Sequence, residues 1–248
     1  MTVLGSGTAP GGKLRLAAQL PGGEQLSSIS DYQLAAAEKA GVEFRLGAPA
    51  DAAAILALAP DAVVVATGAT MIRPRWLPAE AAAWAPDLRS ALPGLLALRG
   101  SQPGTAVLFD QDHTDSTYAA VELLHRRFAR VVLVTPRESI AQDCWLVTRQ
   151  GILRRLHRLG TTLLTATEPV WNDAPAEGRL DCANVHTGAI ASIDNLACFT
   201  WSTPRAPQDA LAAPLRAAGI AVHIVGDARN ARGAMAATAE GHAAGRAI

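Results

Sequence analysis

One short strand end in the sequence carries residue types that could bind a nucleotide. Val222–Asp227 reads VHIVGD, a strand that ends in Gly226 and Asp227 immediately before a helical stretch. An aspartate at this place could accept hydrogen bonds from a ribose or ribityl hydroxyl, while the N-terminus of the helix faces a phosphate. Arg229 and Arg232 could then face a diphosphate, although an ordinary solvated start of a helix explains them as well.

A second strand end offers the same kind of edge. The stretch VVVATGA places Thr67, Gly68 and Ala69 directly after a buried strand. Open α/β sheets bind their ligands at the carboxyl ends of their strands, and a glycine there allows close backbone approach. Each of the two motifs is also compatible with an ordinary turn. Their joint presence predicts a ligand edge.

The opening glycines do not form a phosphate loop of their own. In Val3–Leu14 (VLGSGTAPGGKL), Gly5 and Gly7 have the first spacing of G-x-G-x-x-G. Pro10 takes the third glycine position, however, and lacks the N–H that a phosphate would need. Residues 20–35 do not have a strand pattern, so no acidic residue ends a second strand at the required distance.

The sequence predicts neither a catalytic group nor a metal site in this chain. The three cysteines contain no C-x-x-C pair and no accompanying histidine spacing; they are Cys144, Cys182 and Cys198. None of the six histidines has a serine or a carboxylate at the spacing of a catalytic triad.

Composition and charge limit the partners. The 248 residues contain 22 basic and 22 acidic side chains, so the net charge of zero gives no electrostatic reason to expect nucleic acid or an anionic membrane as a partner. No N-terminal leader pattern is present, and no apolar run reaches the ~18 residues of a membrane span. These features predict a soluble, cytoplasmic protein.

Short β-branched runs alternate with Ala- and Leu-rich amphipathic stretches, which is the pattern of βαβ units on a parallel sheet. Strands are expected at 42–46, 62–66, 106–110, 131–135, 162–165 and 221–225. Helices are expected at 31–40, 52–58, 116–128, 147–159, 208–218 and 231–248. Residues 180–199 indicate an antiparallel pair with a turn at 186–189, and residues 168–179 indicate an exposed loop.

The order of these elements predicts two Rossmann-like units in an α/β fold, the second inserted in the first. Residues 1–75 and 215–248 would form the outer unit, and residues 105–205 would form the inner one. Residues 76–104, rich in Pro, Trp and Ala, would be the connector.

The motifs taken together resemble a known family. The stretches VLGSGTAPGGKLRLAAQLPGG, AGVEFRLG, DAVVVATGA and VHIVGDARNARGAMAATAEGHAAGRAI resemble, in this order, the C-terminal nucleotide-binding region of the trimethylamine dehydrogenase and 2,4-dienoyl-CoA reductase group of the old yellow enzyme superfamily. AVLFDQDHTDSTYAAVELL and RVVLVTPRESIAQ are similar to the central NAD(P)-type domain of that group. The resemblance implies that the opening glycines form the turn after the second strand of an FAD-type domain.

The sequence departs from the family pattern at three places. The true phosphate loop of the family lies upstream of such a turn, so the outer unit lacks its N-terminal βα unit. Gly5 stands where the family usually has an acidic residue for the adenosine ribose. The glycine-rich turn of the central domain is replaced by DQDHTDSTYAA, which has no glycine. Bulky and acidic side chains there would crowd and repel a pyrophosphate, so the inner unit is expected to be degenerate.

The resemblance implies one subunit of a heteromeric flavin-dependent oxidoreductase. A larger partner chain would hold FMN and a 4Fe-4S cluster and catalyse oxidative N-demethylation of a small methylated amine or betaine, or a related enoate or dienoyl reduction. This chain would bind FAD or ADP at the subunit junction through Gly11, Gly12, Lys13, Thr67, Gly68, Ala69, Gly226 and Asp227. Two alternatives are a non-catalytic structural subunit without nucleotide and a stand-alone FAD-dependent NAD(P)H reductase.

Overall fold

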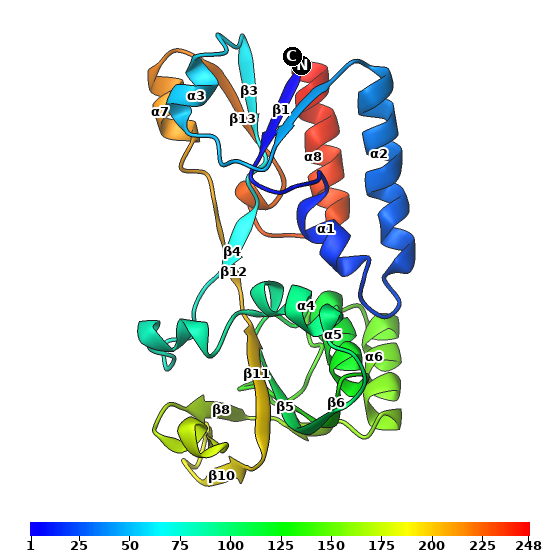
Figure 1. The fold of residues 1–248 in the computed structure, drawn as a ribbon, viewed down its shortest axis with the longest axis vertical. Coiled ribbons are helices and arrows are strands. Elements are labelled where there is room, and N and C mark those ends of the chain that lie inside the picture. The colour runs from blue at the N-terminus through cyan, green and yellow to red at the C-terminus, as the bar shows by residue number, and fades with distance from the viewer. The chain divides into compact units, whose positions relative to one another are not determined.

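The computed structural model describes residues 1–248, and its secondary-structure elements gather in two units (Figure 1). Unit 1 comprises residues 1–15, 27–72 and 205–248, and unit 2 comprises residues 16–26 and 73–204. Helix α1 (Gly12–Ala17) begins in the first of these units and ends in the second. The mixed α/β architecture with parallel strands is confirmed.

Unit 2 is built on a four-stranded parallel sheet in the order β11-β5-β6-β7. Its strands are β5 (Gln102–Asp110), β6 (Phe128–Val134), β7 (Thr162–Leu164) and β11 (Leu196–Ser202). In the register of the sheet, Val107 lies opposite Val132 on one side and Phe199 on the other. Residues 106–110 and 131–134 are at most 1% exposed. Parallel strands are covered on both faces, which is why these runs are almost continuously apolar.

The three long helices of unit 2 each bury one apolar face. They are α4 (Leu88–Ala97), α5 (Asp115–His125) and α6 (Leu146–Arg158), with the short 3-10 helices η1 (Glu24–Leu26), η2 (Ala79–Ala83) and η3 (Ala174–Glu177). Helix α5 has Tyr118, Val121 and Leu124 on its buried side, a spacing of three that follows one face of a helix. Helix α4 begins at Asp87, whose carboxylate caps the first turn by accepting the Arg89 N–H at 2.9 Å.

A second, antiparallel sheet of unit 2 has the order β10-β9-β8. Its strands are β8 (Thr167–Val170), β9 (Leu180–Asn184) and β10 (Ile190–Ile193). The predicted loop at 168–179 is wrong for its first three residues, because they belong to β8. Pro169 argues against a strand, but β8 is an edge strand of its sheet, where a residue without a backbone N–H is tolerated.

Two other predicted boundaries need correction. The end of the expected antiparallel pair at 180–199 belongs to β11, which instead runs parallel to β5. The run Cys198–Ser202 extends the main sheet because Phe199 and Trp201 are buried on it, and the Trp201 indole N–H donates to the Ala85 carbonyl at 2.9 Å. Phe128, expected at the end of a helix, opens β6 and is buried.

Unit 1 holds three separate two-stranded ribbons. β1 (Thr2–Gly5) pairs in parallel with β2 (Glu43–Leu46), and β3 (Ala62–Val65) pairs in parallel with β13 (Ala221–Ile224). β4 (Ala69–Met71) pairs antiparallel with β12 (Arg205–Pro207). Each strand therefore has one hydrogen-bonded neighbour within the chain.

The helices of unit 1 are α2 (Ser27–Lys39), α3 (Ala52–Leu56), α7 (Ala212–Ala217) and α8 (Ala234–Ala247), with the 3-10 helix η4 (Gly226–Ala228). α2 has no buried residue, and α8 has only Ala244. Unit 1 thus buries far less of its helices than unit 2 does. No helix of the chain is both long and apolar enough to cross a membrane.

All six predicted strands and all six predicted helices are present, with shifts at their ends. The largest strand shift is at β5, which starts at Gln102 rather than at Ala106. The largest helix shift is at α2 and α7, each of which starts four residues away from its predicted position.

Candidate functional site

The glycine turn at the start of α1 brings a lysine to Asp227. Gly11 and Gly12 have φ values of 105° and 49°, the left-handed region that favours glycine. The turn closes with the Leu14 N–H donating to the Gly11 carbonyl at 3.1 Å. Lys13 follows on α1, and its ammonium donates a short hydrogen bond to the Asp227 carboxylate. The structure thus brings together two predicted parts of the site that lie 214 residues apart in the sequence.

Asp227 is the centre of this cluster. It lies in η4, directly after β13, and is 8% exposed. Besides Lys13 it accepts the backbone N–H of Arg232 at 3.0 Å, and an Arg205 guanidinium nitrogen lies 3.6 Å from its carboxylate. Burial acts to raise the pKa of Asp227, but the hydrogen bonds from Lys13 and Arg232 and the nearby positive charges outweigh it, so the pKa lies below its usual range. The Asp227 carboxylate is therefore ionised, and its oxygens accept hydrogen bonds.

A second carboxylate, Glu240, organises the same turn from α8. It accepts the Gly226 N–H at 2.7 Å and an Arg229 guanidinium N–H at 3.3 Å, and it forms a short contact with Arg232. The hydrogen bond from Arg232, followed by that from Gly226, lowers the pKa of Glu240. Gly233 is the N-cap residue of α8 and has no side chain, so the first-turn N–H groups have no side-chain acceptor from the N-cap.

Sequence reasoning missed Glu240 and Arg205. Glu240 lies on α8, two helical turns beyond its first residues, and no local motif marks it. Arg205 lies on β12, whose pairing with β4 brings it into unit 1. Arg232, a partner of Glu240, precedes α8, so no helical spacing in the sequence linked the two residues.

The predicted residues of the second strand end make other contacts. The Thr67 hydroxyl donates a short hydrogen bond to the Gln208 carbonyl, and the Gly68 carbonyl accepts the Gln208 N–H at 2.9 Å. Ala69 opens β4 and lies opposite Pro207. Gly68 has a φ of 80°, which fits a glycine. These residues fix β12 to β4, and β12 in turn carries Arg205 toward Asp227.

A small pocket lies at the carboxyl ends of β1 and β2 in unit 1, with a volume of about 260 Å³. It is lined by Leu4, Arg45, Leu46, Ala48, Pro49, Ala50, Ala54 and Leu58. The lining is mostly apolar, with one cation that pairs with Glu43 at 2.8 Å. The pocket lies at the edge where parallel sheets bind ligands.

In unit 2 the corresponding loop is filled by its own side chains. Asp110, at the end of β5, accepts the backbone N–H groups of Asp112 at 3.1 Å and His113 at 2.9 Å, and the Tyr118 hydroxyl at 2.8 Å. In a glycine-rich loop, N–H groups of this kind are available to a phosphate. Because a buried carboxylate already accepts them, this loop does not fit a dinucleotide.

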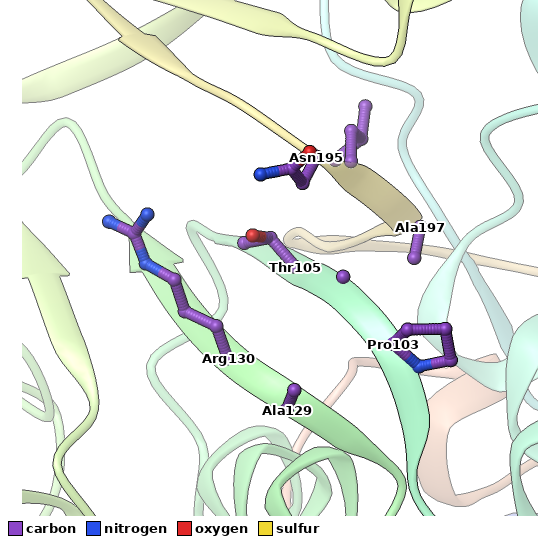
Figure 2. A pocket seen from close by; sticks show the side chains of 8 residues that line it. Pro103, Thr105, Ala129, Arg130, Asn195 and Ala197 are labelled. Carbon is purple, nitrogen blue, oxygen red and sulfur yellow. The ribbon is translucent and has the colours of Figure 1, made fainter.

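A pocket of unit 2, of about 600 Å³, lies at the amino ends of three strands (Figure 2). It is lined by Pro103, Gly104, Thr105, Ala129, Arg130, Asn195, Leu196 and Ala197. Figure 2 shows Arg130 on β6 and Thr105 on β5, with Asn195 at the start of β11. The pocket contains none of the predicted site residues, and Arg130 is its one charged group. It offers no pair of groups for acid–base chemistry.

The cysteines and acidic residues give no reactive centre. The Cys144 thiol donates to the His113 carbonyl at 3.3 Å and to Asp115 at 3.2 Å. Burial, with the hydrogen bond to Asp115, raises the pKa of Cys144 to about 12, so the reactive thiolate is scarce at neutral pH. No group of three or more His, Cys, Asp or Glu side chains could hold a metal ion.

Comparison with solved structures defines the class of fold. The chain superposes on thioredoxin reductase from Lactococcus lactis with a TM-score of 0.70 and 17% identity, over 99% of this chain and 88% of that one. It superposes on histamine dehydrogenase from Rhizobium sp. 4-9 with a TM-score of 0.81 and 22% identity, over 100% of this chain and 38% of that one. The chain thus has the fold of the thioredoxin reductase-like FAD/NAD(P) proteins.

Sequence comparison is more specific. No protein-family model matches the chain. It is 34% identical over 185 residues to a probable N-methylproline demethylase from Rhizobium meliloti, covering 71% of this chain and 26% of that protein. It is 28% identical over 233 residues to an NADH oxidase from Thermoanaerobacter brockii, covering 89% and 33%. The chain therefore spans between a quarter and a third of the length of these relatives. The sequence identity and the likeness to histamine dehydrogenase support the resemblance to the trimethylamine dehydrogenase-like group.

Proposed function

We propose that this chain is the nucleotide-binding subunit of a heteromeric flavin-dependent oxidoreductase and corresponds to the C-terminal region of its longer relatives. Residues 1–75 and 215–248 would be an incomplete FAD- or ADP-binding domain, and residues 105–205 a degenerate NAD(P)-type domain. The observation that carries the proposal is the convergence of Lys13, Arg205 and the turn at 226–232 on Asp227 in unit 1.

The charges of this cluster suit a phosphate-bearing nucleotide. Four cations, Lys13, Arg205, Arg229 and Arg232, surround only two carboxylates, Asp227 and Glu240. The local excess of positive charge favours a ligand with about two negative charges, which a diphosphate carries. Asp227 would accept hydrogen bonds from the sugar or ribityl hydroxyls, and the glycine turn at 11–12 and Thr67–Ala69 would border the ligand.

The reaction would belong to a partner chain. The relatives include a probable N-methylproline demethylase and an NADH oxidase, so the proposed reaction is oxidative N-demethylation of a small methylated amine or betaine, or a related enoate or dienoyl reduction. FMN and a 4Fe-4S cluster on the larger partner would accept and pass on the electrons of the substrate. No residue of this chain is assigned to catalysis.

The open ribbons of unit 1 support the need for a partner. β1 pairs only with β2, and β3 only with β13, so both ribbons have unpaired edges. Helices α2 and α8 of the same unit have only one buried residue between them, Ala244. Parallel strands are normally covered on both faces and at their edges, and an obligate interface with a larger subunit would provide that cover.

Identification of the bound nucleotide tests the proposal. The chain would be purified with whatever co-purifies and denatured, and the released molecule identified by absorbance and mass. Release of FAD would support an electron-carrying subunit, and release of ADP would support a scaffold of the trimethylamine dehydrogenase type. If no nucleotide is released and neither FAD nor ADP binds in titration, the proposal is wrong.

Asp227→Ala sharpens this test. The nucleotide has sugar or ribityl hydroxyl groups that can donate to Asp227, and inorganic pyrophosphate has none. The loss of the negative charge of Asp227, by contrast, should change the affinities for the nucleotide and for inorganic pyrophosphate alike. The preference of the protein for nucleotide over pyrophosphate should therefore fall by about tenfold or more, as measured by calorimetric titration of both. Asp61→Ala, an exposed aspartate of the same unit, is the matched control. An unchanged preference in Asp227→Ala would remove Asp227 from the site.

Two observations favour the alternative of a non-catalytic structural subunit. Gly5 carries no acidic side chain for a ribose, and the loop of unit 2 is filled by Asp110. A chain that binds no nucleotide but forms a stable complex with a larger oxidoreductase subunit would support this alternative.

A further inference from the structure

Glu240 is an anion held inside the cluster that the proposed function assigns to a diphosphate. Its side chain is 15% exposed, and its two carboxylate oxygens accept hydrogen bonds from one backbone N–H and two guanidinium groups. The backbone donor is Gly226, directly before Asp227. Glu240 therefore neutralises the same arginines that could bind the phosphates of a ligand.

The two arginines remain accessible while they pair with Glu240. The side chain of Arg229 is 64% exposed and that of Arg232 is 43% exposed. Exposed ion pairs contribute little to stability, so an incoming anion can break them at a small cost. The Asp227 carboxylate forms its ion pairs with two other cations, Lys13 and Arg205. Glu240 is thus the carboxylate whose partners are free to exchange with a ligand.

We propose that Glu240 competes with the diphosphate of the ligand for Arg229 and Arg232, and thereby sets the affinity of unit 1 for phosphate-bearing ligands. This inference rests on the proposed function. In the absence of ligand the two guanidinium groups bind Glu240. On binding they turn to the phosphates, and the carboxylate keeps the Gly226 N–H.

Glu240→Gln isolates the charge. Glutamine keeps the length of the side chain and an oxygen that can accept the Gly226 N–H, but it lacks the negative charge that holds the arginines. The variant should bind inorganic pyrophosphate roughly three- to tenfold more tightly than the wild type in calorimetric titration at low salt, and this gain should shrink as salt is added. Glu38→Gln, an exposed glutamate of α2, makes the same charge change and should leave the affinity within twofold.

A second background separates charge competition from a structural role of Glu240. In the variant Arg229→Gln/Arg232→Gln, pyrophosphate binding should weaken, and the addition of Glu240→Gln should give no gain. If Glu240→Gln does not fold, the variant Arg229→Gln/Arg232→Gln provides the test by itself. A pyrophosphate affinity of that variant equal to the affinity of the wild type then overturns the inference. Equal or weaker binding by a folded Glu240→Gln, while the wild type binds, overturns the inference and leaves the proposed function standing. Failure of all variants and the wild type to bind pyrophosphate, FAD or ADP overturns both.

Discussion

At the scale of single residues, Asp110 occupies the backbone N–H groups of the loop that follows β5 in unit 2. The carboxylate is fully buried, and burial raises its pKa to about 6 although three hydrogen bonds favour the ionised form. His113, beside it, has its pKa lowered to about 4, first by burial and then by the charge of Arg137. Both groups are held in a network that also includes Tyr118 and Thr135.

This network makes a pH-dependent prediction. Because the folded-state pKa of Asp110 lies above its ordinary value of 3.8, its contribution to stability is complete below pH 3.8 and is lost as the pH rises through about 6. The free energy of unfolding of the wild type, relative to that of Asp110→Asn, should therefore fall by about 1–3 kcal/mol between about pH 4 and pH 7.

Urea unfolding of both proteins across that range measures the difference. His113 follows the opposite trend, since its depressed pKa removes stability as the pH falls through about 4, but it is present in both proteins. A difference between wild type and Asp110→Asn that stays constant from pH 4 to pH 7 would contradict the assignment.

Part of the candidate site could be predicted from the sequence at this scale. Asp227 was recognisable because it ends a strand before a helix, and Lys13 because it follows two glycines. Their contact, across 214 residues, became visible only in the fold. Glu240 and Arg205 could not be predicted, because a helix face and an antiparallel strand pairing bring them to Asp227 and no local motif records either.

At the scale of elements, prediction succeeded where burial dictates composition. β6 was recognisable from Val131–Val134 because strands covered on both faces are continuously apolar. β8 was missed because Pro169 argues against a strand unless the strand lies at the edge of its sheet. The order of strands in a sheet cannot be predicted from a short stretch of sequence, so the edge position of β8 was not recognisable. β11 was assigned to the wrong neighbour for the same reason, since strand partners depend on long-range packing.

The pairing of β5 with β11 gives a prediction for one glycine. Gly104 has a φ of 96°, and a Cβ atom there would lie 2.8 Å from both the Ala197 Cβ and the Asn195 carbonyl oxygen. Gly104→Ala should therefore destabilise the protein by about 1–3 kcal/mol, through backbone strain and overpacking. The measurement is the free energy of unfolding in urea.

Gly94 is the matched control. It lies exposed in α4, and a Cβ atom there would meet nothing within 4 Å. Gly94→Ala should stabilise the helix by about 0.5–1 kcal/mol, because alanine loses less backbone entropy than glycine on folding. Equal effects of the two substitutions would show that β5 and β11 are not tightly packed around Gly104.

At the scale of the whole molecule, the two units differ in how far they complete their own structure. In unit 2, β5 and β6 each have hydrogen-bonded neighbours on both sides, and their central residues are fully buried. In unit 1, the parallel strands have one neighbour each, and β1 has no buried residue. Burial and pairing set the free energy of local opening, so the units should differ in stability.

Amide hydrogen exchange of the isolated chain tests this difference. Backbone amides of β1, β2, β3 and β13 should exchange at least about tenfold faster than those of β5 and β6, because their strands open without breaking a buried sheet. Exchange of the edge amides in β1 and β3 should slow when the proposed larger subunit is bound, whereas exchange in β5 should not change. Equal protection of both units in the isolated chain would mean that unit 1 is stable on its own, and the unpaired edges would then no longer argue for an obligate partner.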